Sequence, residues 1–399
     1  MKLNRKYISL IIFVSLIYSC IEPFDFKTTS FESALVVEAS ISNELKTQVI
    51  KLSRTYRLED SAITNETGAI ISVSDDQGNT YSFNELSPGK YSSSTPFAAM
   101  QNRNYQLMIK TNDNRTYTSN NQQIKSSSPL QNVTAKAITT NVGGIEKEGI
   151  SINAESYDAD RNSNFYRYEY EETYKIISPF WSPQQLEVVL RVLPFRVRLI
   201  NRTKEEKTCY ATNISNEIIQ TETATLSEDR VNFPVKFIER SDFTIRNRYS
   251  ILVKQYVQSI EAYTFYKILN ELSSSENLFS QTQPGTLIGN IVSNENENES
   301  VLGFFEVSSV SSKRIFFNFS DFYQGDVPEH IEDCERIAPL LRDRTTSPLI
   351  HDLDAGRYIY FMENPRTEVH LVGPYLLVPK SCGDCTVLGS NVKPNFWID

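Results

Sequence analysis

From residue 33 onward, apolar and polar side chains alternate with a period of two, the pattern of β-strands that bury one face. The clearest runs are ALVVEASI (34–41), TQVIKLSRTY (47–56) and NYQLMIKT (104–111). Turn residues separate such runs, among them Gly78 and Gly89, which can take the positive φ that tight turns require. Many short strands joined by turns are typical of two packed sheets. We therefore expect a β-sandwich over residues 33–125.

The alternation stops at KSSSPLQNV (125–133), where serines and a proline indicate a domain boundary. It then returns, and the segment FYRYEYEETY places Tyr166, Tyr168 and Tyr170 on one face and charged residues on the other. A row of tyrosines can bind sugars, but on an alternating strand we interpret it as sheet packing. Residues 130–399 are predicted to form a second, larger β-rich domain.

One segment, SIEAYTFYKILNELSS, follows helical rather than strand spacing. Its apolar face comprises Ala262, Phe265, Tyr266 and Leu269. Ser259 is suited to the N-cap, and Glu261 suits the positive first turn. We expect one α-helix at about 259–272, docked on a sheet by its apolar face.

Within the first domain, the spacing A-x-I-x-V-x-D-x-x-G-x-x-Y, followed by G-x-Y, resembles transthyretin-like and carboxypeptidase regulatory domains. That resemblance implies a small sandwich that acts as a spacer or adaptor. The predicted fold class is therefore mainly β: an N-terminal transthyretin-like or immunoglobulin-like β-sandwich, then a larger β-rich domain with one docked helix.

The N-terminus has the layout of an export signal, with three basic residues before an apolar run over residues 8–18. This run is too short to span a bilayer. Ile17-Tyr18-Ser19-Cys20 resembles a bacterial lipobox, in which the cysteine thiol receives diacylglycerol and becomes the new N-terminus. An ordinary signal peptide with a chance cysteine is the alternative, but Cys20 stands where the apolar run ends. We expect a signal peptide over 1–19 and a lipidated tether over 20–32, held to a membrane by two or three acyl chains.

The charge balance narrows the set of partners. Loss of residues 1–19, which carry three positive charges and no negative ones, changes the net charge from −9 to −12. A net acidic surface disfavours nucleic acid, which needs basic patches. We therefore expect no nucleic-acid partner, and contact with a membrane through the lipid anchor.

Lipidation of Cys20 leaves four of the five cysteines: Cys209, Cys334, Cys382 and Cys385. An even number in an exported chain favours disulfides. Zinc is an alternative, but only one pair is close in sequence and the three histidines lack ligand spacing. A redox motif of the thioredoxin type is a second alternative. In such a motif a helix follows the C-x-x-C, but here glycine and proline follow it and indicate a loop. We expect two disulfides, of undetermined connectivity, and no bound metal or cofactor.

An acidic turn precedes the tyrosine-rich strand. Asp158, Asp160 and Asn162 alternate there, and Glu169 falls at the twelfth position, which nearly fits a calcium loop. The sixth position is Ser163, where the sharp turn requires glycine, and strands rather than helices are predicted on both sides. We interpret the segment as a turn, with calcium binding as the alternative.

Motifs of catalysis are missing from the sequence: there is no G-x-S-x-G elbow, no P-loop and no dinucleotide-binding fingerprint. We therefore assign no catalytic residues. A modification motif is present, because Asp60-Ser61-Ala62 resembles the short pattern of O-glycosylation sites in periplasmic proteins of Bacteroidota. Ser61 is accordingly a candidate for a sugar.

Several segments together resemble the Bacteroidota lipoprotein family known as domain of unknown function 4249. They are LVVEASISN…KLSRTY, ISVSDDQGNTYSF…GKY, NYQLMIKT, YSILVKQYVQSIEAYTFYKIL, QPGTLIGNI, VLGFFEVSS and CGDC…GSNVKPNFW. The family has no assigned activity, so it supplies no catalytic residues. The resemblance implies an outer-membrane lipoprotein of two β domains, on the periplasmic or the cell-surface face, often encoded beside TonB-dependent receptors. We expect a non-catalytic accessory or binding protein of nutrient uptake; the alternative is a hydrolase that degrades extracellular polymers.

Overall fold

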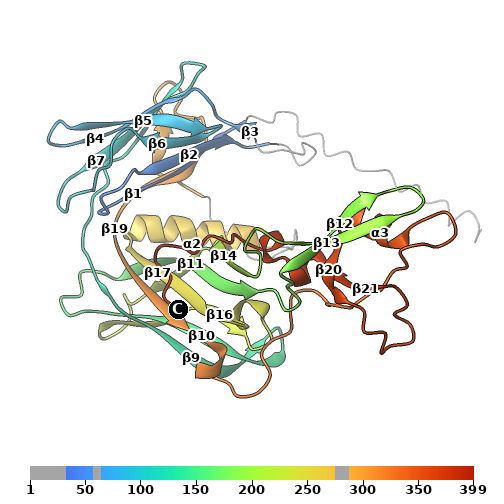
Figure 1. Cartoon of the computed structure of the whole chain (residues 1–399). Coiled ribbons are helices and arrows are strands. Elements are labelled where there is room, and N and C mark those ends of the chain that lie inside the picture. Colours follow the sequence, from blue (N-terminus) through green and yellow to red (C-terminus); the bar gives the residue numbers. More distant parts are fainter. Residues whose placement is uncertain (1–32, 57–63, 275–286) are drawn as a thin grey trace, which may run out of the picture.

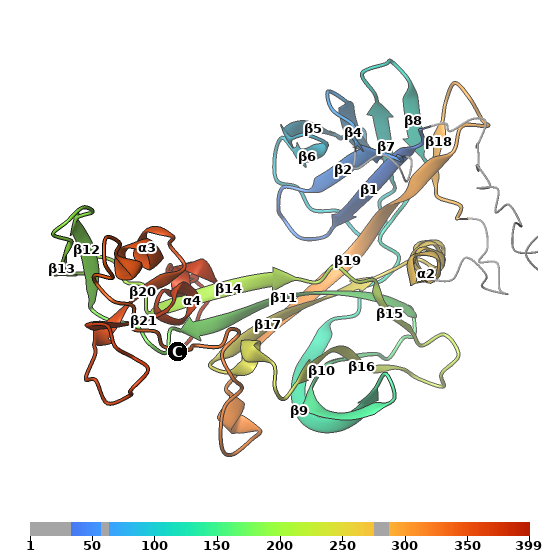
Figure 2. The ribbon, with the colours of Figure 1, turned by 90° about the vertical axis from the view of Figure 1, so that its right-hand side faces the viewer.

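The computed structural model describes residues 33–56, 64–274 and 287–399. The chain forms an N-terminal sandwich, a central pair of sheets and a smaller lobe near the C-terminus (Figures 1 and 2). One path of hydrogen-bonded strands runs through the first two parts. The predicted fold class, mainly β with a sandwich followed by a larger β-rich part, is confirmed.

The N-terminal sandwich is a sheet that folds over on itself around one core. Its strands are β1 (Leu35–Ser42), β2 (Val49–Arg54), β3 (Thr64–Asn65), β4 (Ile70–Asp75), β5 (Thr80–Ser87), β6 (Lys90–Ser93), β7 (Tyr105–Lys110) and β8 (Thr116–Ser119). Alternation decides which residues enter the core: on β7, Tyr105, Leu107 and Ile109 are fully buried, whereas Met108 is half-exposed. Burial of these apolar faces stabilises the sandwich.

The central part packs a three-stranded sheet against the far end of the long sheet. The smaller sheet contains β9 (Leu130–Val142), β10 (Ile145–Asp158) and β16 (Asp229–Glu239); the long sheet contributes β11 (Phe165–Ile177), β14 (Thr208–Ile214), β15 (Ile219–Glu222) and β17 (Tyr249–Val257). Tyr166 and Tyr168 of β11 are buried between the two sheets, and Tyr170 packs against the same core. Tyr168 stacks on Phe233 of β16 with ring centroids 5.7 Å apart. The tyrosine row is therefore sheet packing, as predicted.

A single long strand joins these two parts. β19 (Val301–Phe317) pairs in parallel with β1 up to Ser308, and from Ser309 it pairs antiparallel with β17. Figure 2 shows β19 crossing from the sandwich to the central sheet. β18 (Ile291–Ser293) also pairs with β8 of the sandwich. Residues 291–308, which the sequence interpretation placed in the second domain, thus supply strands to the N-terminal sheet.

Helix α2 (Ile260–Ser274) lies over the central sheet, on the side that faces the sandwich (Figure 1). The Ser259 hydroxyl accepts a hydrogen bond from the Ala262 amide at 3.1 Å, so the predicted N-cap is confirmed. Ala262 and Phe265 are buried against Phe304 of β19. The helix therefore docks by the face that its apolar spacing indicated.

The smaller lobe combines residues near 180–207 with the C-terminal segment. Its elements are β12 (Gln184–Leu190), β13 (Arg196–Asn201), α3 (Pro348–Asp354), β20 (Tyr358–Glu363), β21 (Tyr375–Pro379) and α4 (Lys380–Gly383). Three short 3₁₀ turns, whose buried residues pack in the central core, lie outside this lobe: η1 (Phe243–Ile245), η2 (Phe319–Asp321) and η3 (Cys385–Val387). Leu349, Tyr360 and Leu377 form the lobe's own small core. Within the described ranges, no helix combines the length and apolar character needed to cross a membrane.

Candidate functional site

A cleft of about 1020 Å³ lies between the N-terminal sandwich, helix α2 and the central sheet. Strands β1 and β2 line one wall, α2 and the start of β19 line another, and β11 and β17 contribute charged and aromatic side chains. The cleft exists because β19 holds the sandwich over the central sheet. Cavities of this size at the junction of two structural units are common ligand sites.

Alternation along β11 brings Arg167 into this cleft. Tyr166 and Tyr168 point into the core between the sheets, so Arg167 and Glu169 point to the opposite face of the strand. Tyr256 of β17 stands directly opposite Arg167 in the antiparallel register. Their side chains therefore share the face that α2 covers, and Arg167 is only 9% exposed.

Arg167 is the centre of a buried polar cluster. Its Nη1 donates to Glu169 at 2.5 Å, and its Nη2 donates to Glu306 of β19 at 3.3 Å. The guanidinium carbon lies 4.3 Å from the centre of the Tyr256 ring and 5.3 Å from that of Tyr266, within the range of a cation–π contact. Tyr256 also donates its hydroxyl to Glu169 at 2.9 Å. The cluster thus connects two strands of the central sheet, the helix and the bridging strand.

Electrostatics keep this cluster ionised. Burial disfavours the charged form of Arg167, but the Glu306 and Glu169 carboxylates outweigh it and hold the pKa of the guanidinium above its usual value. Burial also acts to raise the pKa of Glu169, but the Arg167 charge and the hydrogen bonds from Arg167 and Tyr256 lower it below the ordinary value. Burial and the nearby carboxylates raise the pKa of Tyr256 and of Tyr266. At neutral pH Arg167 and Glu169 are therefore charged, and the phenols of Tyr256 and Tyr266 are neutral.

The helix gives the cleft an apolar and aromatic wall. Phe265 lies 5.5 Å from Phe304 and 5.4 Å from Tyr266 between ring centroids, and Leu269 and Leu287 pack beside them. On the opposite wall the charges are exposed and paired, as in the contact of Lys51 with Glu38 at 2.8 Å. The arrangement can hold an amphipathic ligand, with an apolar part on the helix side and polar groups towards Arg167 and the β1–β2 wall.

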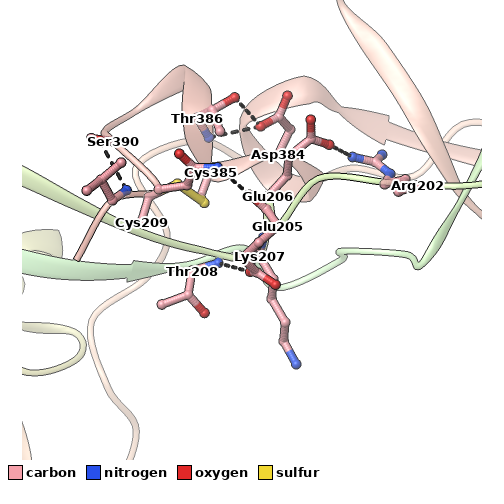
Figure 3. The surroundings of a disulfide bond; sticks show 12 residues. Arg202, Glu205, Glu206, Lys207, Thr208, Cys209, Asp384, Cys385, Thr386 and Ser390 are labelled. Carbon is pink, nitrogen blue, oxygen red and sulfur yellow. Dashed lines mark hydrogen bonds and ion pairs between the residues drawn. A yellow bond between two sulfur atoms is a disulfide. The ribbon is translucent and has the colours of Figure 1, made fainter.

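The four cysteines predicted to pair form two disulfides, Cys209–Cys385 and Cys334–Cys382. Figure 3 shows the first of these, between β14 and the 3₁₀ turn at Cys385. Backbone hydrogen bonds flank it: the Cys385 amide donates to Glu206 at 2.9 Å, and the Tyr210 amide donates to Ser390 at 2.8 Å. The close pair Cys382 and Cys385 therefore does not bridge within itself, and each member ties the tail to a different part of the chain.

In the acidic turn, the first carboxylate accepts hydrogen bonds from backbone amides of the turn itself. Asp158 accepts hydrogen bonds from the amides of Asp160 and Asn162 at 3.1 Å and of Ser163 at 3.0 Å. Such bonds are typical of an aspartate that shapes a turn. Glu169, the twelfth position of the calcium pattern, lies instead on β11 beside Arg167.

Two predicted sites lie outside the described residues. Cys20, the expected lipid acceptor, falls within 1–32, and Ser61, the candidate for a sugar, falls within 57–63. Lipidation and glycosylation therefore remain predictions from the sequence.

From the sequence, Phe265, Tyr266 and Leu269 were recognised as a helix face, but Arg167 and Glu306 were not recognised as a pair beside a cleft. Arg167 lies on the charged face of its strand, whereas the sequence interpretation concerned the tyrosine face. Glu306 lies within an apolar strand, and the sequence indicated no partner for it. One signal was available: a charged residue in the middle of VLGFFEVSSV, a run otherwise suited to burial, requires a buried counter-charge. Arg167 provides it.

The fold and the cleft together define a class: a β-rich protein with a cleft at the junction of its sandwich and its central sheets. The chain belongs to the family described as domain of unknown function 4249 (DUF4249), whose family model matches residues 21–314. Comparisons with curated proteins and with solved structures found no match. The matched range covers the sandwich, the bridging strand nearly to its end and every residue of the Arg167 cluster.

Proposed function

We propose that this protein is a non-catalytic binding protein of the outer membrane, anchored through lipid on Cys20 and associated with a TonB-dependent receptor in nutrient uptake. The observation that carries the binding role is the cleft of about 1020 Å³ with its aromatic wall and its charged cluster at Arg167. The lipobox-like sequence at Cys20 supports the anchor. The resemblance to lipoproteins encoded beside such receptors supports the receptor as partner.

The chemistry of the cleft favours binding over hydrolysis. Most glycoside hydrolases pair a carboxylate with a carboxylic acid whose pKa is raised so that it can donate a proton. Glu169 has the opposite property, because Arg167 and Tyr256 lower its pKa. A fixed negative charge of this kind orients a ligand but is a poor proton donor. The alternative of a polymer-degrading hydrolase is therefore the less favoured one.

Anchoring is tested by metabolic labelling with a fatty-acid analogue. The wild-type chain should carry the label and sediment with the outer membrane, whereas Cys20→Ala should carry none and leave the membrane fraction or remain an unprocessed precursor. Protease treatment of intact cells then distinguishes the cell-surface face from the periplasmic face. An unlabelled wild-type chain that needs no membrane would exclude the lipoprotein proposal.

The cleft is tested by a pair of matched helix variants. Leu269→Arg places a charge on the apolar wall, whereas Thr264→Arg adds the same side chain at an exposed helix position outside the cleft. Affinity capture from solubilised outer membranes should retain the receptor with wild type and Thr264→Arg and lose it with Leu269→Arg. Retention of the receptor by all three chains would show that the cleft is not the docking site. Native mass spectrometry of the same samples detects a small ligand if the cleft binds the transported substrate instead.

A further inference from the structure

A second cluster of chemistry-bearing residues lies far from the cleft, beside one of the disulfides. His330 neighbours the Cys334–Cys382 pair, and the ligand atoms of these three residues all lie within 4.8 Å of one another. Cys382 is on helix α4 and is fully buried, while His330 and Cys334 belong to the segment between η2 and α3. Three soft or borderline donors therefore converge from two separate parts of the chain.

The imidazole of His330 is the unusual member of this cluster. Both of its nitrogens are buried, and neither makes a hydrogen bond that satisfies normal geometry. The ring packs edge-on against Phe243, with centroids 5.3 Å apart. Buried polar atoms in native proteins are nearly always paired, and an exception calls for a reason such as an ion. A metal ion bound beside the two sulfurs would satisfy one of these nitrogens.

We propose that His330, Cys334 and Cys382 form a redox-dependent binding site for Zn²⁺ or a similar soft divalent cation. In the oxidised protein the two sulfurs are bonded to each other and the site is closed. A dithiol reductant passes two electrons and two protons to the Cys334–Cys382 disulfide, which yields two thiols, while the reductant itself becomes a disulfide. Cation binding then displaces the two thiol protons, and the neutral His330 imidazole donates a lone pair.

The donor set fits this class of ion. Thiolate and imidazole are the ligands that zinc prefers, and three protein ligands leave a fourth position for water. The metal would also preserve a structural link, because Cys382 belongs to the tail and Cys334 to the body of the chain. Reduction followed by metal binding thus replaces the disulfide bond by two metal–sulfur bonds, and α4 stays attached to the rest of the chain.

The second disulfide provides an internal comparison. Cys209 and Cys385 are both fully buried, whereas Cys334 is partly exposed and can be reached by a reductant. Among the residues that the structure describes, Cys209 and Cys385 belong to no such group of three donors. Mild reduction should therefore open Cys334–Cys382 first and create a site only there.

The experiment uses the purified mature chain and Co²⁺ as a spectroscopic probe, with Zn²⁺ as competitor. Mild dithiol treatment should free one pair of thiols, identified by alkylation and peptide mapping, while circular dichroism shows that the fold is kept. The reduced chain should bind one equivalent of Co²⁺ with a thiolate charge-transfer band that Zn²⁺ abolishes, and the oxidised chain should show no band. His330→Ala should weaken binding by more than the roughly tenfold to hundredfold that loss of an outer-sphere partner costs.

Matched variants keep the proposal open to refutation. Cys209→Ser/Cys385→Ser should bind the metal as the wild-type chain does, and Cys334→Ser should not bind it. If mild reduction unfolds the chain, protein produced in a reducing cytosol without residues 1–19 supplies folded thiol-form material, whose zinc content is measured by elemental analysis. Absence of metal from folded, reduced protein would overturn the proposal, and so would unchanged affinity in His330→Ala.

Discussion

Arg167 of β11 and Glu306 of β19 form an ion pair in which both side chains are buried, with Nη2 and Oε2 3.3 Å apart. Glu306 stands opposite Ser40 in the parallel pairing with β1 of the sandwich, whereas Arg167 stands opposite Tyr256 in the central sheet. Gln258 donates a further hydrogen bond to Glu306 at 3.1 Å. The pair therefore links the two parts of the molecule beside the cleft that they enclose.

Replacement of Arg167 by methionine should destabilise the protein strongly. Glu306 is 1% exposed and would be left buried without its cation, a defect that costs about 3–5 kcal/mol. Urea unfolding followed by tryptophan fluorescence measures the loss. The double variant Arg167→Met/Glu306→Leu should recover part of it, because the buried carboxylate at position 306 is then removed, although Glu169 still lacks its cation. The exposed pair Arg198–Glu187 is the control, and Arg198→Met should change stability little.

The hairpin turn between β4 and β5 should make the sandwich sensitive to acid. Burial acts to raise the pKa of Asp75, but hydrogen bonds from Asn79, Gln77 and Arg103 outweigh it and lower that pKa below 3.8. A carboxylate with a lowered pKa in the folded state adds stability that is complete above its unfolded pKa and disappears as the pH falls through the folded value. We therefore expect stability to decline from about pH 4 downwards.

Asp75→Asn tests this assignment, because it keeps the shape of the side chain and removes its charge. The variant should be less stable than wild type at neutral pH, and the difference should shrink as the pH falls below 3.8. Thermal unfolding across a series of acidic buffers measures both effects. A difference that stays constant over the whole series would contradict the role given to the charge.

Two turn glycines should differ in their tolerance of alanine. Gly78 and Gly89 both have positive φ, 84° and 73°, so alanine costs roughly 1–2 kcal/mol at either position. A Cβ at Gly78 meets nothing within 4 Å, whereas at Gly89 it falls 2.5 Å from the Leu52 carbonyl oxygen. Gly89→Ala should therefore be the more damaging change, since it also disturbs the bond from the Leu52 amide to Gly89. Equal melting temperatures for the two variants would argue against this packing.

The two disulfides should stabilise the chain unequally. They join residues separated by 176 positions (Cys209–Cys385) and by 48 positions (Cys334–Cys382). Loop-closure entropy then gives about 5 kcal/mol for the first and about 4 kcal/mol for the second. Peptide mapping without reductant should recover these two pairs, and the corresponding double serine variants should lose stability in this order. A Cys382–Cys385 peptide would show that the pairing is wrong.

Elements whose cause is local follow from the amino-acid sequence alone. Alternation along residues 34–41 and 104–111 predicts strands because a pleated chain turns successive side chains to opposite faces. Helix α2 followed from the spacing of its apolar residues and from Ser259, since helix caps depend on groups within one turn. The even number of cysteines likewise indicated disulfides before any pairing was known.

Features that depend on which surfaces meet follow only from the packing of the folded chain. Alternation showed that Arg167 and Tyr166 face opposite sides of β11, but it carried no information on what covers the Arg167 side. That cover comes from α2 and from β19, elements distant in sequence, and it turns a charged strand face into the buried edge of a cleft. Four cysteines allow three sets of disulfide pairs, and long-range packing likewise selects Cys209–Cys385 with Cys334–Cys382. The physical reason is that periodicity reports the direction of a side chain, whereas burial depends on long-range packing.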